Sequence, residues 1–173
     1  VVKTLDEEGN ETPLGEPGEL CVKGPQVMRG YWQRPEDTRK SFTEDGYLRT
    51  GDIALIQEDG YIRIVDRKKD MIISGGLNIY ANDLELVLLQ DDDVIDAAVI
   101  GVPSDAWGET PLGLIVQRVG AIRSTDDILT QANARLGKSQ RLSSVEVREV
   151  LPRSTIGKIL KKDLRASYWE KDT

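Results

Sequence analysis

The sequence predicts an α+β protein in two parts, and three observations support this. Up to residue 66 the chain reads as short strands separated by turns rich in Gly and Pro, which indicates a β-rich part. Residues 67–69 are a basic run that leaves a strand and is hard to bury, so we expect a solvated joint there. From residue 71 the predicted strands alternate with helices, which is typical of a compact α+β domain. We therefore predict domains at residues 1–68 and 69–173.

Short apolar or alternating runs between turns predict the strands of the first part, and the alternation is clearest in the last three. They cover residues 1–5, 19–23, 47–52, 53–57 and 61–66. Asp59-Gly60 predicts a primed hairpin turn between the last two, since that turn needs positive φ and Asp-Gly adopts it with little strain. Pro35 opens a short predicted helix over residues 34–42, because Pro at the first helical position with acids beside it suits a helix N-terminus.

The second part begins with a predicted hairpin, residues 71–74 and 77–80, around Gly75-Gly76. Helices are predicted from a cap at Asn82-Asp83 to about residue 90, from a cap at Ser124, and over residues 159–169. The apolar residues expected to face the core are Leu84, Val87, Leu88, Ile128, Leu129, Ala132 and Leu136. Strands at residues 94–102, 112–118 and 145–150 complete a small three-stranded sheet with helices plus the hairpin.

The composition excludes several classes of protein. The chain has no histidine and one cysteine, Cys21, so Ser-His-Asp and Cys-His chemistry, the commonest zinc sites and an internal disulfide are excluded, and we predict no metal site. A net charge of −7 argues against a general nucleic-acid binder. No apolar run reaches membrane-spanning length and no secretory signal is present, so we expect a cytoplasmic chain, with peripheral membrane contact and oligomeric state left open. The first residue is Val rather than Met, which suggests a fragment.

Two basic clusters stand out from this acidic background and suggest a specific anionic ligand. They are Arg67, Lys68 and Lys69, and then Arg153, Lys158, Lys161, Lys162 and Arg165. From residue type alone, solvated surface is the more common explanation for such clusters.

Several motifs, in one order along nearly the whole chain, resemble those of the adenylate-forming enzymes, and most closely the fatty-acyl-CoA ligases. They are GEPGELCVKGPQVMRGYW, DGYLRTGDIALIQEDGYIRIVDRKKDMI, ISGGLNIYANDLE, GVPSDAWGE and LPRSTIGKILKKDLR. An ordered set is far more specific than a single short pattern. The family's Gly/Ser/Thr-rich phosphate loop is absent from the sequence. The resemblance therefore implies the C-terminal portion of such an enzyme: the β-rich end of its large domain and its small mobile domain.

The resemblance implies roles for seven residues. Asp52 and Arg67 would bind the nucleotide, Lys69 would be the hinge, Ser74, Gly75 and Gly76 would line the tunnel for the pantetheine arm of CoA, and Lys158 would be catalytic. The residue types suit these roles. A carboxylate can accept hydrogen bonds from two vicinal hydroxyls, and a guanidinium can donate to hydroxyl or phosphate oxygens. An ammonium can stabilise the negative charge that develops during adenylate formation. Without the resemblance, Asp52 reads as an ordinary turn aspartate, the basic residues as solvated, and the glycines as a hairpin turn.

The chain departs from the family pattern at a few positions. Ala81 stands where Pro is usual and Asp83 where Glu is usual, which leaves the affinity for CoA open. Ile156 is bulkier than the residue usual before Gly-Lys, and residues 136–141 lack the usual aromatic, lysine and proline, so no role is assigned there. Trp107-Gly108-Glu109 matches the pattern, and we interpret it as packing and a turn.

The resemblance implies part of an ATP-dependent acid–thiol ligase that activates a fatty acid through acyl-AMP to its acyl-CoA thioester. ATP and CoA would be substrates, and Mg²⁺ would accompany ATP on ligands outside this chain. We expect the chain alone to be inactive, because the phosphate loop and the acyl pocket are missing from it. Two alternatives stay open. One is the same scaffold acting on an aryl or amino acid, and the other is a non-catalytic module whose basic clusters bind an anion or a partner protein.

Overall fold

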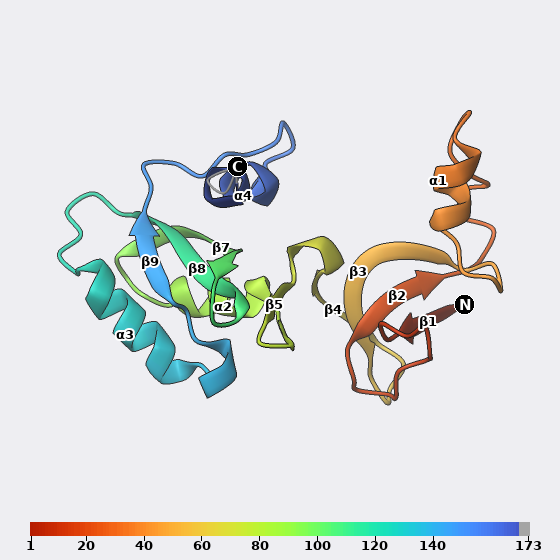
Figure 1. Cartoon of the computed structure of the whole chain (residues 1–173), viewed down its shortest axis with the longest axis horizontal. Coiled ribbons are helices and arrows are strands. Elements are labelled where there is room, and N and C mark those ends of the chain that lie inside the picture. The colour runs from red at the N-terminus through yellow and green to blue at the C-terminus, as the bar shows by residue number, and fades with distance from the viewer. Residues whose placement is uncertain (170–173) are drawn as a thin grey trace. The chain divides into compact units, whose positions relative to one another are not determined.

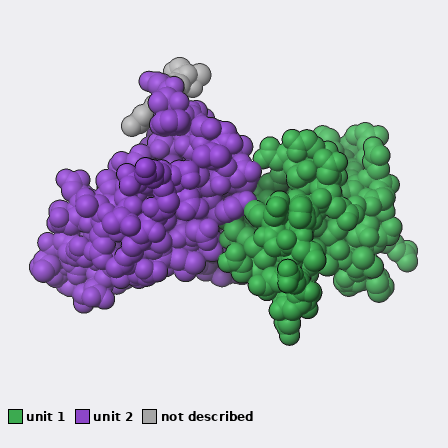
Figure 2. All heavy atoms as spheres, turned by 90° about the horizontal axis from the view of Figure 1, so that it is seen from below, with its two compact units in different colours: residues 1–69 green, residues 70–173 purple. Residues whose placement is uncertain are grey.

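The computed structural model describes residues 1–169, in a chain that forms two compact units (Figure 2). Unit 1 comprises Val1–Lys69 and unit 2 comprises Asp70–Thr173. The short 3₁₀ helix η1 (Lys68–Asp70) contains the point of division. Each unit has its own sheet and its own buried side chains.

Unit 1 is an antiparallel meander in which each strand pairs with the next. β1 (Val2–Leu5), β2 (Gly18–Val22), β3 (Leu48–Ile56) and β4 (Ile62–Arg67) lie in that order in one sheet, and α1 (Pro35–Lys40) lies between β2 and β3 in the chain (Figure 1). Pro35 stands at the start of α1, as predicted. The buried apolar side chains of the unit are Leu5, Leu20, Cys21, Ile53, Ala54 and Val65.

The predicted break between residues 52 and 53 is wrong, because β3 runs through it as one strand. Gly51 has a φ of 73°, and the register of β2 against β3 shifts at this point, because Cys21 pairs with Arg49 whereas Glu19 pairs with Ile53. An irregularity of the β-bulge kind therefore accommodates the left-handed glycine without ending the strand.

The turn at Asp59-Gly60 differs from the predicted primed turn. Gly60 has a φ of 84°, whereas Asp59 does not have a positive φ. The Gly60 N–H donates to the Gln57 carbonyl at 2.9 Å, and the Tyr61 N–H donates to Asp59 Oδ1 at 3.1 Å. The loop therefore has glycine alone in the left-handed region, which is the arrangement of three-residue hairpin loops.

Unit 2 is an α+β domain, which confirms the predicted fold class. Its strands are β5 (Ile72–Ser74), β6 (Leu77–Ile79), β7 (Val94–Ser104), β8 (Gly108–Gln117) and β9 (Ser144–Val147). β8 pairs antiparallel with β7 along its whole length and parallel with β9. The hairpin β5–β6 joins β8 through the single pair Ser74 and Gly108, so it extends the predicted three-stranded sheet.

Helices cover both faces of this sheet. α2 (Ala81–Leu88) and α3 (Thr125–Arg135), which η2 (Lys138–Gln140) follows, pack on one face, and α4 (Lys161–Trp169) packs on the other. Leu84, Leu88, Ile128 and Ala132 are buried in the first core as predicted, with Val87, Leu129 and Leu136 partly buried against it. The second core contains Ala98, Ile100, Leu112, Leu114 and Leu151 under Leu164 and Tyr168 of α4. Within residues 1–169 no helix has the length and apolar character needed to cross a bilayer.

Two helix starts test the predicted caps. Ser124 caps α3, since its Oγ accepts a hydrogen bond from the Asp127 N–H at 3.1 Å. The predicted cap at Asn82-Asp83 is wrong, because α2 begins at Ala81 and both residues lie in its first turn.

Two other predicted ends, the start of α4 and the end of β7, differ from those in the structure. α4 begins at Lys161 rather than residue 159, because Ile159 forms a bridge with Arg153 and the Leu160 N–H donates to the Pro152 carbonyl. β7 continues through Pro103, since β7 is an edge strand and can tolerate a residue without an N–H.

We expect Leu84→Ala to destabilise unit 2 far more than Leu86→Ala in the same helix. Leu84 is fully buried and Leu86 is 54% exposed, so only the first change leaves a cavity. The free energy of unfolding should fall by about 2–5 kcal/mol for Leu84→Ala and by less than about 0.5 kcal/mol for Leu86→Ala. Urea denaturation followed by far-ultraviolet circular dichroism measures both, and equal losses would contradict the burial of this helix face.

Candidate functional site

Asp52 and Arg67 lie opposite each other on paired strands. They are register partners on β3 and β4, and Arg67 Nε lies 2.8 Å from Asp52 Oδ1. The Asp52 side chain is 26% exposed and that of Arg67 is 49% exposed. An ion pair so accessible to solvent adds little stability. It presents a carboxylate and a guanidinium side by side, a suitable arrangement for hydroxyl and phosphate oxygens.

A buried carboxylate on β2, which sequence patterns did not single out, binds two cations near the end of unit 1. The Glu19 side chain is 6% exposed, and its Oε2 accepts hydrogen bonds from Arg49 Nη1 at 2.8 Å and Lys68 Nζ at 2.9 Å. Burial raises the pKa of Glu19, but the hydrogen bonds from Lys68 and Arg49 outweigh burial and hold it below its ordinary value. The Lys68 ammonium is therefore tied to the sheet and not simply solvated. An acid within the apolar strand GELCV is the signal that could have found this contact.

Lys69 lies in the connector between two anchored neighbours. The units divide directly after it, within η1. Lys68 on one side is bound to Glu19 of unit 1, and Asp70 on the other is bound to Arg165 of unit 2, with 3.4 Å between the charged atoms. A 3₁₀ turn of this length is common in connectors.

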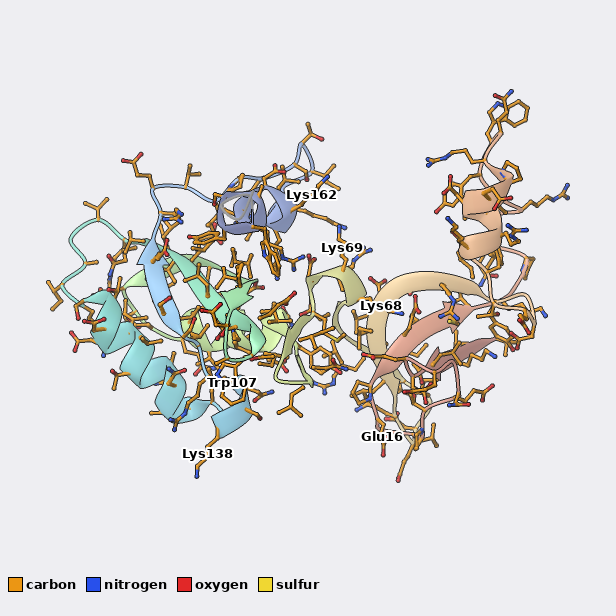
Figure 3. All side chains as sticks on the ribbon, in the orientation of Figure 1. Glu16, Lys68, Lys69, Trp107, Lys138 and Lys162 are labelled. Atoms are coloured by element: carbon orange, nitrogen blue, oxygen red, sulfur yellow. The ribbon has the colours of Figure 1, made fainter. Side chains whose placement is uncertain are left out.

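Ser74, Gly75 and Gly76 form the tight β5–β6 turn that the sequence predicts. Ser74 pairs with Leu77, and the two glycines between them have φ of 57° and 79°, which is the signature of a primed two-residue turn. The Gly75 N–H donates to the Trp107 carbonyl at 2.9 Å. A Cβ on Gly75 would lie 2.7 Å from Trp107 Cε3, so the indole ring (labelled in Figure 3) packs on the turn. This confirms Trp107 as a packing residue.

Lys158 lies in a tight turn between β9 and α4. The Ser154 N–H donates to the Lys158 carbonyl at 2.8 Å, and the Gly157 N–H donates to the Ser154 carbonyl at 2.9 Å. Residues 155–158 are exposed. Instead of an open loop, the structure shows a turn closed by hydrogen bonds, and the turn displays the ammonium of Lys158 to solvent.

The seven predicted site residues thus occupy four places. Asp52 and Arg67 form an ion pair, Lys69 lies in the connector, Ser74, Gly75 and Gly76 form the hairpin turn, and Lys158 lies in the turn before α4. The hairpin attaches to β8, whereas the Lys158 turn attaches to β7 through Arg153 and Asp96. In the described part of the chain, no group of three or more Asp, Glu or Cys side chains could hold a metal ion.

Comparison with known proteins gives matches along nearly the whole chain. Residues 83–158 match the family model for the AMP-binding enzyme C-terminal domain, and residues 1–32 match the model for AMP-binding enzymes. The long-chain-fatty-acid–CoA ligase of Salmonella typhimurium is 49% identical over 164 residues, which are 94% of this chain and 29% of that protein. The feruloyl-CoA synthase of Amycolatopsis sp is 42% identical over 167 residues, 96% of this chain and 34% of that protein. The chain therefore spans about a third of the length of these relatives.

Two solved structures of MatB from Rhodopseudomonas palustris are also similar. The ATP-bound form has a TM-score of 0.92 at 37% identity, covering 97% of this chain and 34% of that chain. The apo form has a TM-score of 0.68 at 38% identity over the same shares. Because both are structures of one protein, the two forms of MatB differ from each other over the matched region.

We expect Gly75→Ala to destabilise unit 2 more than Gly76→Ala, although both glycines have positive φ. Each change should cost about 1–2 kcal/mol for the left-handed backbone. A Cβ at Gly75 would also clash with the Trp107 ring, whereas one at Gly76 would meet no atom within 4 Å. Thermal denaturation of both variants, alone and combined with Trp107→Ala, measures the difference, which should disappear without the ring. A difference that persists would show that the clash is not its cause.

Proposed function

Since this chain belongs to the AMP-binding enzyme family, we propose that it is part of an ATP-dependent ligase that converts a fatty acid, through acyl-AMP, to its CoA thioester. The similarity to fatty-acid–CoA ligases along almost the whole chain carries this proposal. In this proposal residues 1–68 belong to a larger nucleotide-binding domain, and residues 69–173 form a small domain that moves during the reaction.

Asp52 and Arg67 hold the nucleotide in this proposal. The carboxylate accepts hydrogen bonds from the ribose hydroxyls, and the guanidinium donates to hydroxyl or phosphate oxygens. Their pairing at 2.8 Å supports this, because each side chain is ordered by the other before the ligand arrives and loses less entropy on binding. Mg²⁺ would neutralise charge on the ATP phosphates, and no described residue is assigned to it.

Lys158 serves the first half-reaction. A carboxylate oxygen of the acid attacks the α-phosphorus of ATP, pyrophosphate leaves, and acyl-AMP forms. Both reacting groups are anionic, so an ammonium between them lowers their repulsion and stabilises the transition state. The exposure of Lys158 in a turn shaped by Gly157 supports this role, because the side chain can reach a ligand bound by another part of the protein.

The β5–β6 turn serves the second half-reaction, in which the thiol of CoA attacks the acyl carbonyl and AMP leaves. Ser74, Gly75 and Gly76 line the path of the pantetheine arm. A Cβ at Gly76 would meet no atom within 4 Å, so this side of the turn is open and allows the close approach of a ligand to the backbone.

Lys69 is the hinge about which the small domain turns between the first and the second half-reaction. Its neighbours are held by Glu19 and Arg165, each within its own unit, so a change of φ and ψ at this position would reorient the units and leave both of these contacts in place. The two forms of MatB, which differ over the matched region, support movement in a relative.

An aryl acid is the second candidate substrate, because a feruloyl-CoA synthase is among the relatives. Competition between a long-chain fatty acid and a hydroxycinnamic acid for adenylation would separate the two candidates.

We expect Lys158→Ala to slow acyl-AMP formation on the order of 10²–10³-fold, because it removes the charge between the reacting groups. Thioester formation from supplied acyl-AMP and CoA should change little. Both rates are measured in the complete protein that carries this chain, the first by exchange of pyrophosphate into ATP. Lys162→Ala, which changes another exposed lysine (labelled in Figure 3), is the control. Unchanged exchange in a folded Lys158→Ala protein would refute the catalytic role and favour a non-catalytic module.

Lys69→Pro should show the reverse of the pattern expected for Lys158→Ala, because it should slow the second half-reaction and spare the first. Proline fixes φ and restricts the preceding residue, so the hinge could not turn. Acyl-AMP formation should persist, while transfer of the acyl group to CoA should fall by about 10-fold or more. Lys69→Ala, which removes the side chain but keeps backbone freedom, should retain both rates. Normal acyl transfer in Lys69→Pro would rule out a hinge at this residue.

A further inference from the structure

Arg153 connects the turn that carries Lys158 to the sheet of unit 2. Its Nη1 donates to the Gly157 carbonyl at 2.7 Å, and its Nη2 donates to Asp96 Oδ2 on β7 at 2.5 Å. One guanidinium therefore bridges the turn and a strand. We infer that Arg153 is a positioning residue for Lys158, an inference that rests on the catalytic role proposed for Lys158.

The bond to Gly157 acts on the peptide unit that precedes Lys158. The Gly157 carbonyl and the Lys158 N–H belong to one planar group. Arg153 binds its oxygen, and Ser154 Oγ accepts from its N–H at 3.2 Å, so both edges of the plane are held. Gly157 has a φ of 82°, and a Cβ there would meet no atom within 4 Å, so packing does not restrain this plane. Hydrogen bonds therefore set the direction in which Lys158 leaves the turn.

Asp96 provides the fixed end of the connection. It pairs with Val116 in the long β7–β8 ladder, and its Oδ1 accepts from the Ala97 N–H at 3.1 Å, which orients the carboxylate. A second anchor follows the turn, where Lys161 Nζ lies 2.6 Å from Glu85 Oε1. The turn is thus held before and after Lys158, and Arg153 is the anchor that reaches the backbone of the turn itself.

Because the Arg153–Asp96 pair is partly exposed, its loss should affect the position of Lys158 more than the stability of the protein. The Arg153 side chain is 43% exposed and that of Asp96 is 28% exposed, and ion pairs at such positions add little to stability. A misplacement of a reacting group by about 1 Å can nevertheless cost up to about 100-fold in rate. A slow reaction in a protein of nearly normal stability is therefore the expected result of breaking this contact.

Arg153→Ala in the complete protein should slow acyl-AMP formation by about 10- to 100-fold. Thioester formation from supplied acyl-AMP and the melting temperature should change little. Arg153→Lys should not restore the rate, because one ammonium lacks the fixed fork that spans both acceptors. Restoration by lysine, or an unchanged rate in Arg153→Ala, would overturn the inference.

Two further variants serve this test, one as a second way to break the contact and one as a control. Asp96→Asn weakens the same contact from the strand side, should slow acyl-AMP formation in the same direction, and replaces Arg153→Ala if that variant does not fold. Arg148→Ala is the control, since Arg148 is similarly exposed at 36% but binds Glu146 and Tyr168. Its rate should stay normal, and an equal loss in this control would show a general effect of removing an arginine.

The double variant shows whether Arg153 acts through Lys158. If it does, Arg153→Ala combined with Lys158→Ala should be no slower than Lys158→Ala alone, whereas losses that multiply would overturn the inference. The single variants separate the two claims. If Lys158→Ala leaves acyl-AMP formation intact, the proposed function fails. If Lys158→Ala nearly abolishes it and Arg153→Ala has no effect, only the role of Arg153 fails.

Discussion

The antiparallel pairing of β7 with β8 is the contact on which the rest of unit 2 depends. Val99, Ile100, Leu114 and Ile115 in the middle of these strands are fully buried, because helices cover both faces of the sheet. The other elements attach to this pair: β9 lies along β8, the hairpin joins at the start of β8, and Arg153 reaches β7. A slip of one residue would turn every side chain to the opposite face. Both candidate ligand-binding turns therefore keep their places only while this register holds.

Unit 1 combines one buried and one exposed charge contact at the same end of its sheet. Glu19 is buried and accepts from two cations, so the loss of either would leave this buried charge only partly compensated. Asp52 and Arg67 on β3 and β4 are open to solvent, where exchanging one partner for a ligand is easier. The buried contact links β2 to Arg49 of β3 and to Lys68, and the more exposed contact is accessible to a ligand.

Many elements were predictable because each carries a local signal. Ser124 followed by acidic residues signals a helix cap, and Gly75-Gly76 between apolar runs signals a two-residue turn, and both occur. The errors arose where one local signal allows two outcomes. Gly51 lies within β3 rather than ending it, and Gly60 takes the left-handed position alone. The pairing partner decides between such outcomes, and no short window of sequence contains it.

The sequence by itself determined the motifs and their order, and with them the candidate side chains Asp52, Arg67 and Lys158, because these depend only on residue type and spacing. The tertiary structure alone decided what surrounds them. Glu19 meets Lys68 across 49 residues of chain, and Asp96 meets Arg153 across 57. Sheet pairing and helix packing bring such distant side chains together, so local sequence can mark Glu19 as an unusual acid in an apolar strand but cannot name the partner of Glu19 or of Asp96.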